Sequence, residues 1–93
     1  MIYAYVNINI TNPESLGQYR EVAGAALQKH GGTVLTAGKD NVTIEGTHKA
    51  PDMAAILSFP DRAAAMAWIN DPALASVHVL RRGAGDVSII VVG

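Results

Sequence analysis

The sequence predicts an α+β fold in which strands and helices follow one another in the order β-α-β-β-α-β, within one domain over residues 1–93. Three observations carry this prediction. Residues 2–10 alternate between two kinds of side chain, as a strand with one buried face does. Cap residues of helices stand at Asn12 and Asp61. Residues 87–92 are apolar on both faces, which is typical of a strand covered on two sides.

The first strand has two distinct faces. One face carries only aliphatic side chains: Ile2, Ala4, Val6, Ile8 and Ile10. The other face carries two tyrosines and two asparagines: Tyr3, Tyr5, Asn7 and Asn9. Because this second face lacks charges, it suits a surface that meets a partner or lines a wet cavity; an ordinary solvent-exposed face is the alternative.

A helix is expected from Asn12 to about His30. Asn12 caps it, Pro13 stands in the first turn, and Gly31 provides the residue that ends it. Beyond it, residues 33–38 are expected to form a strand, and residues 42–45 a short extra strand.

The second half of the chain predicts one more strand and two short helices before the last strand. A polar loop at 46–52 leads into a continuously apolar strand at 53–59. Asp61 caps an alanine-rich helix at 62–70, and Asp71-Pro72 starts a second short helix that ends at the glycines of 83–85.

This order of elements is that of a ferredoxin-like fold, an antiparallel sheet with both helices on one face. The other face would be bare in a monomer, and it would carry Tyr3, Tyr5 and part of the apolar last strand. Two sheets packing face to face would cover these residues, so we expect a homodimer.

Composition excludes several functional classes. Seven basic and eight acidic residues give a net charge of −1 without any run of one sign, so we expect no nucleic-acid and no membrane partner. The chain has no cysteine, which removes disulfides and thiolate chemistry. It has no basic leader and no apolar run of about 20 residues, which favours a cytoplasmic location.

Short motifs in a fixed order resemble one bacterial family. They are NPE at 12–14 with Tyr19, HGG at 30–32, EG at 45–46, FP at 59–60, Ala64 and Trp68, DP at 71–72 and LRRGAGD at 80–86. Together they resemble the family called domain of unknown function 1330, within the superfamily of dimeric α+β barrels. The resemblance implies a ferredoxin-like dimer and leaves the activity open. Related barrels include small-molecule monooxygenases that need no cofactor, but a shared fold does not transfer a reaction.

His30 is the first candidate for chemistry. Extending the helix at about 100° per residue places it over Leu27, Ala26 and Ala23, facing the sheet. One interpretation is structural, with the imidazole interacting favourably with the helix dipole. The other is a general base or a ligand contact.

Glu45 and Arg81 are the second candidates. If the strand at 42–45 turns Glu45 toward the interior, its carboxylate needs a cation, because an unpaired buried charge is very costly. Arg81 lies on the apolar stripe of the last helix and is the best-placed cation, with Arg82 or Lys49 as alternatives. Such a pair is either structural or part of a ligand site.

The sequence therefore predicts a homodimeric domain that binds a small molecule between sheet and helices. The expected lining residues are Tyr3, Tyr5, His30, Glu45, Trp68 and Arg81. We expect no metal, since no histidine pair has helical ligand spacing, and no cofactor. Whether the domain also catalyses a cofactor-independent reaction stays open. The competing hypothesis is a noncatalytic assembly module without a ligand, in which the same residues serve as caps and ion pairs.

Overall fold

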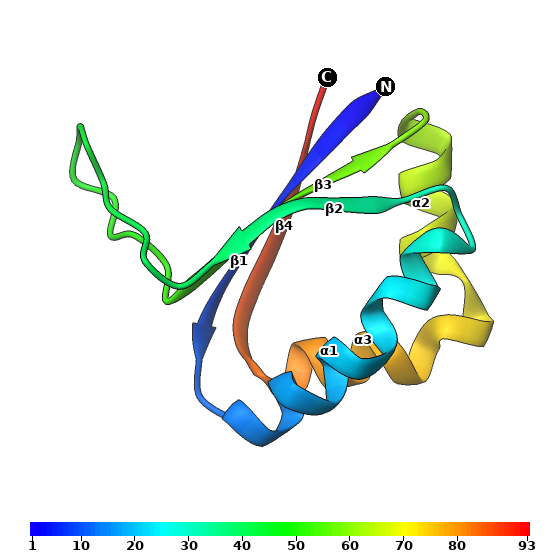
Figure 1. Ribbon diagram of the computed structural model, residues 1–93, viewed down its shortest axis with the longest axis horizontal. Helices are drawn as coiled ribbons and strands as arrows, with labels where there is room; N and C mark the ends of the chain where they lie inside the picture. The colour runs from blue at the N-terminus through cyan, green and yellow to red at the C-terminus, as the bar shows by residue number, and fades with distance from the viewer.

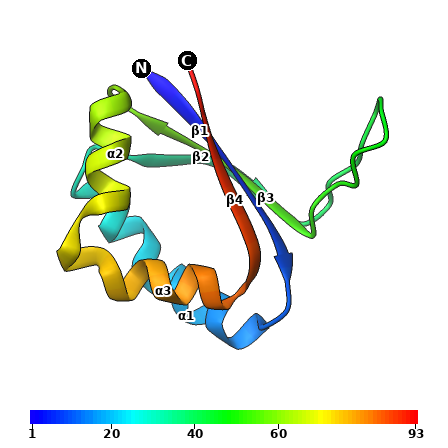
Figure 2. The same cartoon turned by 180° about the vertical axis from the view of Figure 1, so that it is seen from behind.

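One four-stranded sheet with helices on a single face makes up the structure, a computed structural model that describes residues 1–93 (Figures 1 and 2). The elements are β1 (Ile2–Ile10), α1 (Pro13–Gln28), β2 (Thr33–Gly38), β3 (Met53–Phe59), α2 (Arg62–Asn70), the short 3-10 helix η1 (Pro72–Leu74), α3 (Ala75–Gly83) and β4 (Gly85–Val92). The strand order is β2-β3-β1-β4, and every neighbouring pair is antiparallel. The predicted ferredoxin-like fold is confirmed.

The alternation in β1 sorts its side chains as the sequence predicts. Ala4, Val6 and Ile8 are buried against the helices, together with the alternate residues of β3. Tyr3 and Tyr5 therefore lie on the outer face of the sheet, which no helix covers. The core occupies the layer between the sheet and the helices.

The helix caps also form as expected. The Asn12 side chain accepts a hydrogen bond from the Ser15 N–H at 3.2 Å, and Asp61 accepts one from the Ala64 N–H at 2.8 Å. Gly31 has a φ of 74° and ends the helix, but α1 stops at Gln28, two residues before His30. His30 thus belongs to the turn after the helix rather than to its sheet-facing stripe.

The end of β1 lies close to the junction between α3 and β4. The Ala84 carbonyl accepts hydrogen bonds from the Thr11 and Asn12 N–H groups at 2.9 and 3.0 Å. A Cβ on Gly85 would lie 2.0 Å from the Asn9 carbonyl oxygen, so only glycine fits there. This junction holds the last turn of α3, with Arg81, against the sheet.

The predicted strand at residues 42–45 is wrong, because β2 ends at Gly38 and no strand follows before Met53. Residues 39–52 instead form a projection that we call the arm, drawn in green far from the helices (Figure 1). Hydrogen bonds hold the arm in this shape: Asn41 donates to the Gly38 and Pro51 carbonyls, and Thr43 donates to the His48 carbonyl.

No helix of the protein combines the length and the apolar character needed to cross a bilayer.

Candidate functional site

Four side chains form a polar and aromatic cluster inside the otherwise apolar core. Arg81 from α3 is 2% exposed, and its guanidinium carbon lies 5.2 Å from the centroid of Trp68 and 5.7 Å from that of Tyr19. His78, one turn earlier on α3, is also 2% exposed. Its ring is edge-on to that of Trp68, with the two ring centroids 4.9 Å apart. We call Tyr19, Trp68, His78 and Arg81 the Arg81 cluster.

His78 is neutral, and its partners settle its tautomer. Its Nε2 lies 2.9 Å from the Trp68 carbonyl oxygen, which only accepts, and its Nδ1 lies 2.7 Å from Nη1 of Arg81, which only donates. Nε2 therefore carries the proton. Burial lowers the pKa of His78 and the Arg81 and Arg82 charges lower it further, although the hydrogen bond to Trp68 opposes them.

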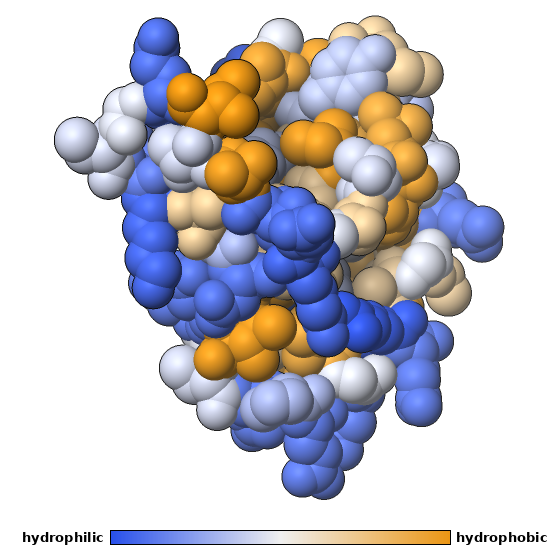
Figure 3. Space-filling model, turned by 60° about the vertical axis from the view of Figure 1, so that its left-hand side comes forward, coloured by the Kyte–Doolittle hydropathy of each residue, from blue (hydrophilic) through white to orange (hydrophobic).

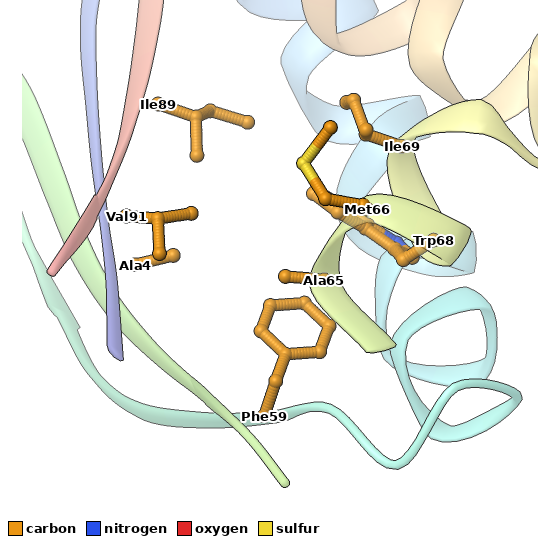
Figure 4. Close-up of a pocket in the computed structure, with 8 residues that line it drawn as sticks. All are labelled: Ala4, Phe59, Ala65, Met66, Trp68, Ile69, Ile89 and Val91. Atoms are coloured by element: carbon orange, nitrogen blue, oxygen red, sulfur yellow. The ribbon is translucent and has the colours of Figure 1, made fainter. Parts of the chain in front are cut away.

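Two apolar cavities border the cluster, one through Trp68 and the other through Tyr19, while His78 and Arg81 line neither. The smaller one, of about 120 Å³, is lined by eight hydrophobic residues: Ala4, Phe59, Ala65, Met66, Trp68, Ile69, Ile89 and Val91. Figure 4 shows its two walls, with Ala4, Ile89 and Val91 on the strands facing the α2 side chains and Phe59. The larger cavity, of about 270 Å³, lies under α1 and includes Tyr19 in its lining. Both cavities lie between the sheet and the helices, which is where the sequence predicts a ligand pocket.

Of the six predicted site residues, the structure brings together only Trp68 and Arg81. Tyr3 and Tyr5 lie on the outer face of the sheet, so they cannot line a space on its helical face. Glu45 lies near the tip of the arm and is exposed. Neither interior cavity includes His30 in its lining. Sequence reasoning did not select His78 as a site residue, although its spacing of three residues from Arg81 on one helical face was a usable signal.

The predicted ion pair between Glu45 and Arg81 is wrong. The prediction required a strand at 42–45 to turn Glu45 inward, and that segment is an exposed part of the arm. The alternatives Arg82 and Lys49 form no ion pair either, since the two salt bridges of the protein both use Asp71. Arg81 has no carboxylate partner at all.

His30 has a structural partner that its sequence position did not reveal. Its Nε2 lies 2.8 Å from Oδ2 of Asp71, and the Lys29 Nζ lies 2.7 Å from the same oxygen. The other carboxylate oxygen accepts a hydrogen bond from the Ala73 N–H and caps η1. This arrangement ties the end of α1 to the junction between α2 and η1. It gives His30 a structural contact, but a different one from the interaction with the helix dipole that the sequence suggested.

Asparagine in place of Asp71 is expected to lower the midpoint of urea unfolding at pH 7. Lys29, His30 and the Ala73 N–H hold the pKa of Asp71 well below its ordinary value of 3.8. A lowered folded-state pKa gives stability that is fully present above the ordinary value and is lost as the pH falls below it. The difference between wild type and Asp71→Asn should therefore shrink when unfolding is repeated at pH 3.

Asp40→Asn provides the control, because Asp40 is an exposed carboxylate of the arm without an ion pair. It should leave both midpoints unchanged. A difference between wild type and Asp71→Asn that is the same at pH 7 and pH 3 would contradict an electrostatic role for Asp71.

No group of three or more histidine, aspartate and glutamate side chains is arranged to hold a metal ion. The three histidines lie in separate places: His30 with Asp71, His78 in the Arg81 cluster and His48 on the arm. The interior site thus consists of one cation, one neutral imidazole, two other aromatic rings and apolar walls.

The outer face of the sheet is apolar and aromatic at its centre. Tyr5 pairs across the strands with Ile56 on one side and Ile90 on the other. Ile90 and Val92 are each more than half exposed, and Tyr3 is 42% exposed. Figure 3 looks at the side from which the arm projects and shows clusters of hydrophobic groups with hydrophilic groups between them. Tyr5 and Ala54 of this face also line a hollow of about 400 Å³ with residues of the arm.

The fold and the interior site define a class: small ferredoxin-like domains with a space between the sheet and its helices. The model of the family described as domain of unknown function (DUF1330) matches residues 1–93, so the chain belongs to that family. No curated protein matches the chain.

Solved structures agree on the fold. The protein RPA0582 of unknown function from Rhodopseudomonas palustris is 21% identical with a TM-score of 0.78, over 98% of this chain and 79% of that one. A dimeric ferredoxin-like protein of unknown function from Jannaschia sp. CCS1 is 15% identical with a TM-score of 0.69, over 99% and 97%. An antibiotic biosynthesis monooxygenase is 16% identical with a TM-score of 0.57, over 100% and 97%. At these identities the likeness concerns the fold alone.

Proposed function

We propose that this protein is a homodimeric domain that binds a small, mostly apolar molecule between its sheet and its helices. The observation that carries the proposal is the buried Arg81, which has no carboxylate partner and stacks on Trp68, a residue that lines the 120 Å³ cavity. A buried charge without an opposite charge destabilises a fold, so a cation kept there in place of an apolar residue is a functional-site signal. We place the ligand in the 120 Å³ cavity, because Trp68 belongs both to its lining and to the Arg81 cluster.

The geometry favours binding over catalysis. Proton transfer needs a base within hydrogen-bond reach of the substrate, and His78 is the imidazole of the cluster. Both of its ring nitrogens are already engaged, one by Arg81 and the other by the Trp68 carbonyl. Proton transfer through His78 in a cofactor-independent reaction would require one of these bonds to open first.

A second copy of the chain is the partner that we propose for the outer face of the sheet. The apolar row of Ile56, Tyr5 and Ile90 crosses the centre of this face, and the Jannaschia neighbour is described as dimeric. The arm is continuous with the face through the hollow that it shares with Tyr5. Its Val42 and Ile44 are 78% and 93% exposed, so we include the arm in the interface. The cytoplasmic location stays a prediction.

A noncatalytic assembly module without a ligand is the second candidate. It is favoured by the hydrogen bond between His30 and Asp71, which gives His30 a structural role, and by the apolar outer face. Both candidates share the dimer, so only the interior cavity separates them.

Toluene binding is expected to depend on the space beside Ala65. Toluene is close in size to benzene, which an apolar cavity of roughly 150 Å³ can hold. It should raise the thermal unfolding midpoint of the wild type, because a ligand that binds only the native state stabilises it. Ala65→Leu directs an isobutyl group from α2 into the 120 Å³ cavity and should abolish the shift.

Ala23→Leu is the matched control, since the same exchange there points into the other interior cavity. It should leave the toluene shift intact. No shift in the wild type would support the assembly module, and a shift lost in Ala23→Leu but kept in Ala65→Leu would overturn the choice of cavity.

A further inference from the structure

We infer that the ligand of this site is a small carboxylate whose charged group accepts hydrogen bonds from Arg81 and Trp68. The inference rests on the proposed binding function and adds the chemical class of the ligand. It follows from which polar atoms of the interior have partners and which do not.

Arg81 keeps unused hydrogen-bonding capacity in the core. Its Nη1 donates to His78, but its Nε is buried and has no acceptor within hydrogen-bond distance. The aromatic rings of Tyr19 and Trp68 offer their faces to the guanidinium, which favours a cation but supplies no acceptor for Nε. Neutral His78 does not balance the charge, so the interior keeps a net positive charge at this point.

Trp68 also has a hydrogen-bond donor without a partner. Its indole Nε1 is buried and has no acceptor. Among all buried side-chain nitrogen and oxygen atoms of the protein, these two alone lack a hydrogen-bond partner. Both are N–H donors, and they belong to residues in contact through the cation–π stack.

An acceptor with a negative charge meets both deficits at once. A donor buried without a partner destabilises the fold, so two of them in contacting residues strongly favour an acceptor at this place. A neutral acceptor such as an amide would satisfy the N–H groups but leave the charge of Arg81 unbalanced. A cationic ligand would be repelled. A carboxylate fits best, because its two oxygens suit the planar N–H donors of a guanidinium.

The cavity limits the rest of the ligand. Its eight lining residues are all hydrophobic and include Trp68 but not Arg81. The carboxylate therefore has to lie at the Trp68 end of the cavity and extend toward Arg81, and the remainder must be a hydrocarbon without further polar groups. At about 120 Å³ it is somewhat smaller than the roughly 150 Å³ that holds benzene, so one aromatic ring or a short branched chain is the upper limit. Benzoate and branched short-chain carboxylates belong to this class.

Calorimetric titration with benzoate and benzamide tests the charge directly, because the two differ little in shape and differ by one charge. Benzoate is expected to bind the wild type at least tenfold more tightly than benzamide. Arg81→Met keeps a side chain of similar length without the charge and should remove this preference. Arg82→Met changes the neighbouring, exposed arginine and should keep it.

The outcomes separate this inference from the proposed function. Equal binding of benzoate and benzamide, or toluene binding without benzoate binding, would overturn the carboxylate and leave the cavity as a binding site. A preference that survives in Arg81→Met would overturn the role of Arg81. No binding of benzoate, benzamide or toluene would overturn the binding function itself. The comparison in the wild type needs no variant, so it decides the ligand class even if Arg81→Met does not fold.

Discussion

Lysine in place of Ile90 is expected to convert the protein from a dimer into a monomer at micromolar concentration. Ile90 is 54% exposed on the outer face of the sheet, directly beside Tyr5 on the neighbouring strand. In the proposed dimer the new ammonium group would be buried against apolar side chains without a partner, and the two-fold symmetry would introduce it twice. We expect association to weaken by at least about 100-fold, which corresponds to roughly 3 kcal/mol. Sedimentation velocity measures the change.

Val79→Lys is the control for this experiment. Val79 is 62% exposed, similar to Ile90, but it lies on α3 in the helical layer. It should leave the dimer intact, while Ile44→Ser should weaken it if the arm contributes to the interface. A wild type that sediments as a monomer would refute the homodimer, and dissociation by Val79→Lys but not by Ile90→Lys would place the interface on the helical side.

Local patterns predict most of the fold because the chain provides long and unambiguous signals. The alternation over β1 extends for nine residues, and each of the two caps precedes a helix. The segment at 42–45 has only four residues, too few to distinguish a strand from an extended loop. Whether these residues form a strand depends on hydrogen bonds to a partner strand, and the pairing of β2 with β3 already ends at Gly38 and Ala54. Strand pairing is a property of the tertiary structure, so the sequence of the segment alone does not reveal it.

The residues of the candidate site were also predictable only in part. Trp68 and Arg81 could be found because each lies within a helix, where the period of the helix assigns a face. The same reasoning failed for His30, because α1 ends at Gln28 and the helical period no longer applies after it. Asp71 lies 41 residues further along the chain, so no spacing rule connects it with His30.

Trp68 links the parts of the molecule that this account depends on. Its ring lies 5.6 Å from that of Phe59 at the end of β3, and its carbonyl fixes the tautomer of His78. It also forms part of the cavity wall. The stability of the fold and the proposed binding function therefore both depend on this one residue.

Alanine in place of Trp68 is expected to lower the free energy of unfolding by about 3–5 kcal/mol, the usual effect of removing a large buried aromatic residue. The side chain is 2% exposed, and its loss would join the space it fills to the 120 Å³ cavity and leave Arg81 with only one of its two stacking rings, that of Tyr19. Urea unfolding followed by circular dichroism measures the difference. For a domain that lacks disulfides, a loss of this size takes much of the total stability.

Trp68→Phe separates packing from hydrogen bonding. Phenylalanine keeps an aromatic ring against Phe59 and removes the buried N–H that has no acceptor, so part of the lost packing is offset by relief of that polar group. We expect a loss of about 1–2 kcal/mol, clearly less than with alanine. If the N–H serves a carboxylate, benzoate should bind Trp68→Phe more weakly than wild type while toluene binds equally well. A stability loss as large as that of Trp68→Ala would instead show that the whole indole is needed to hold the Arg81 cluster in place.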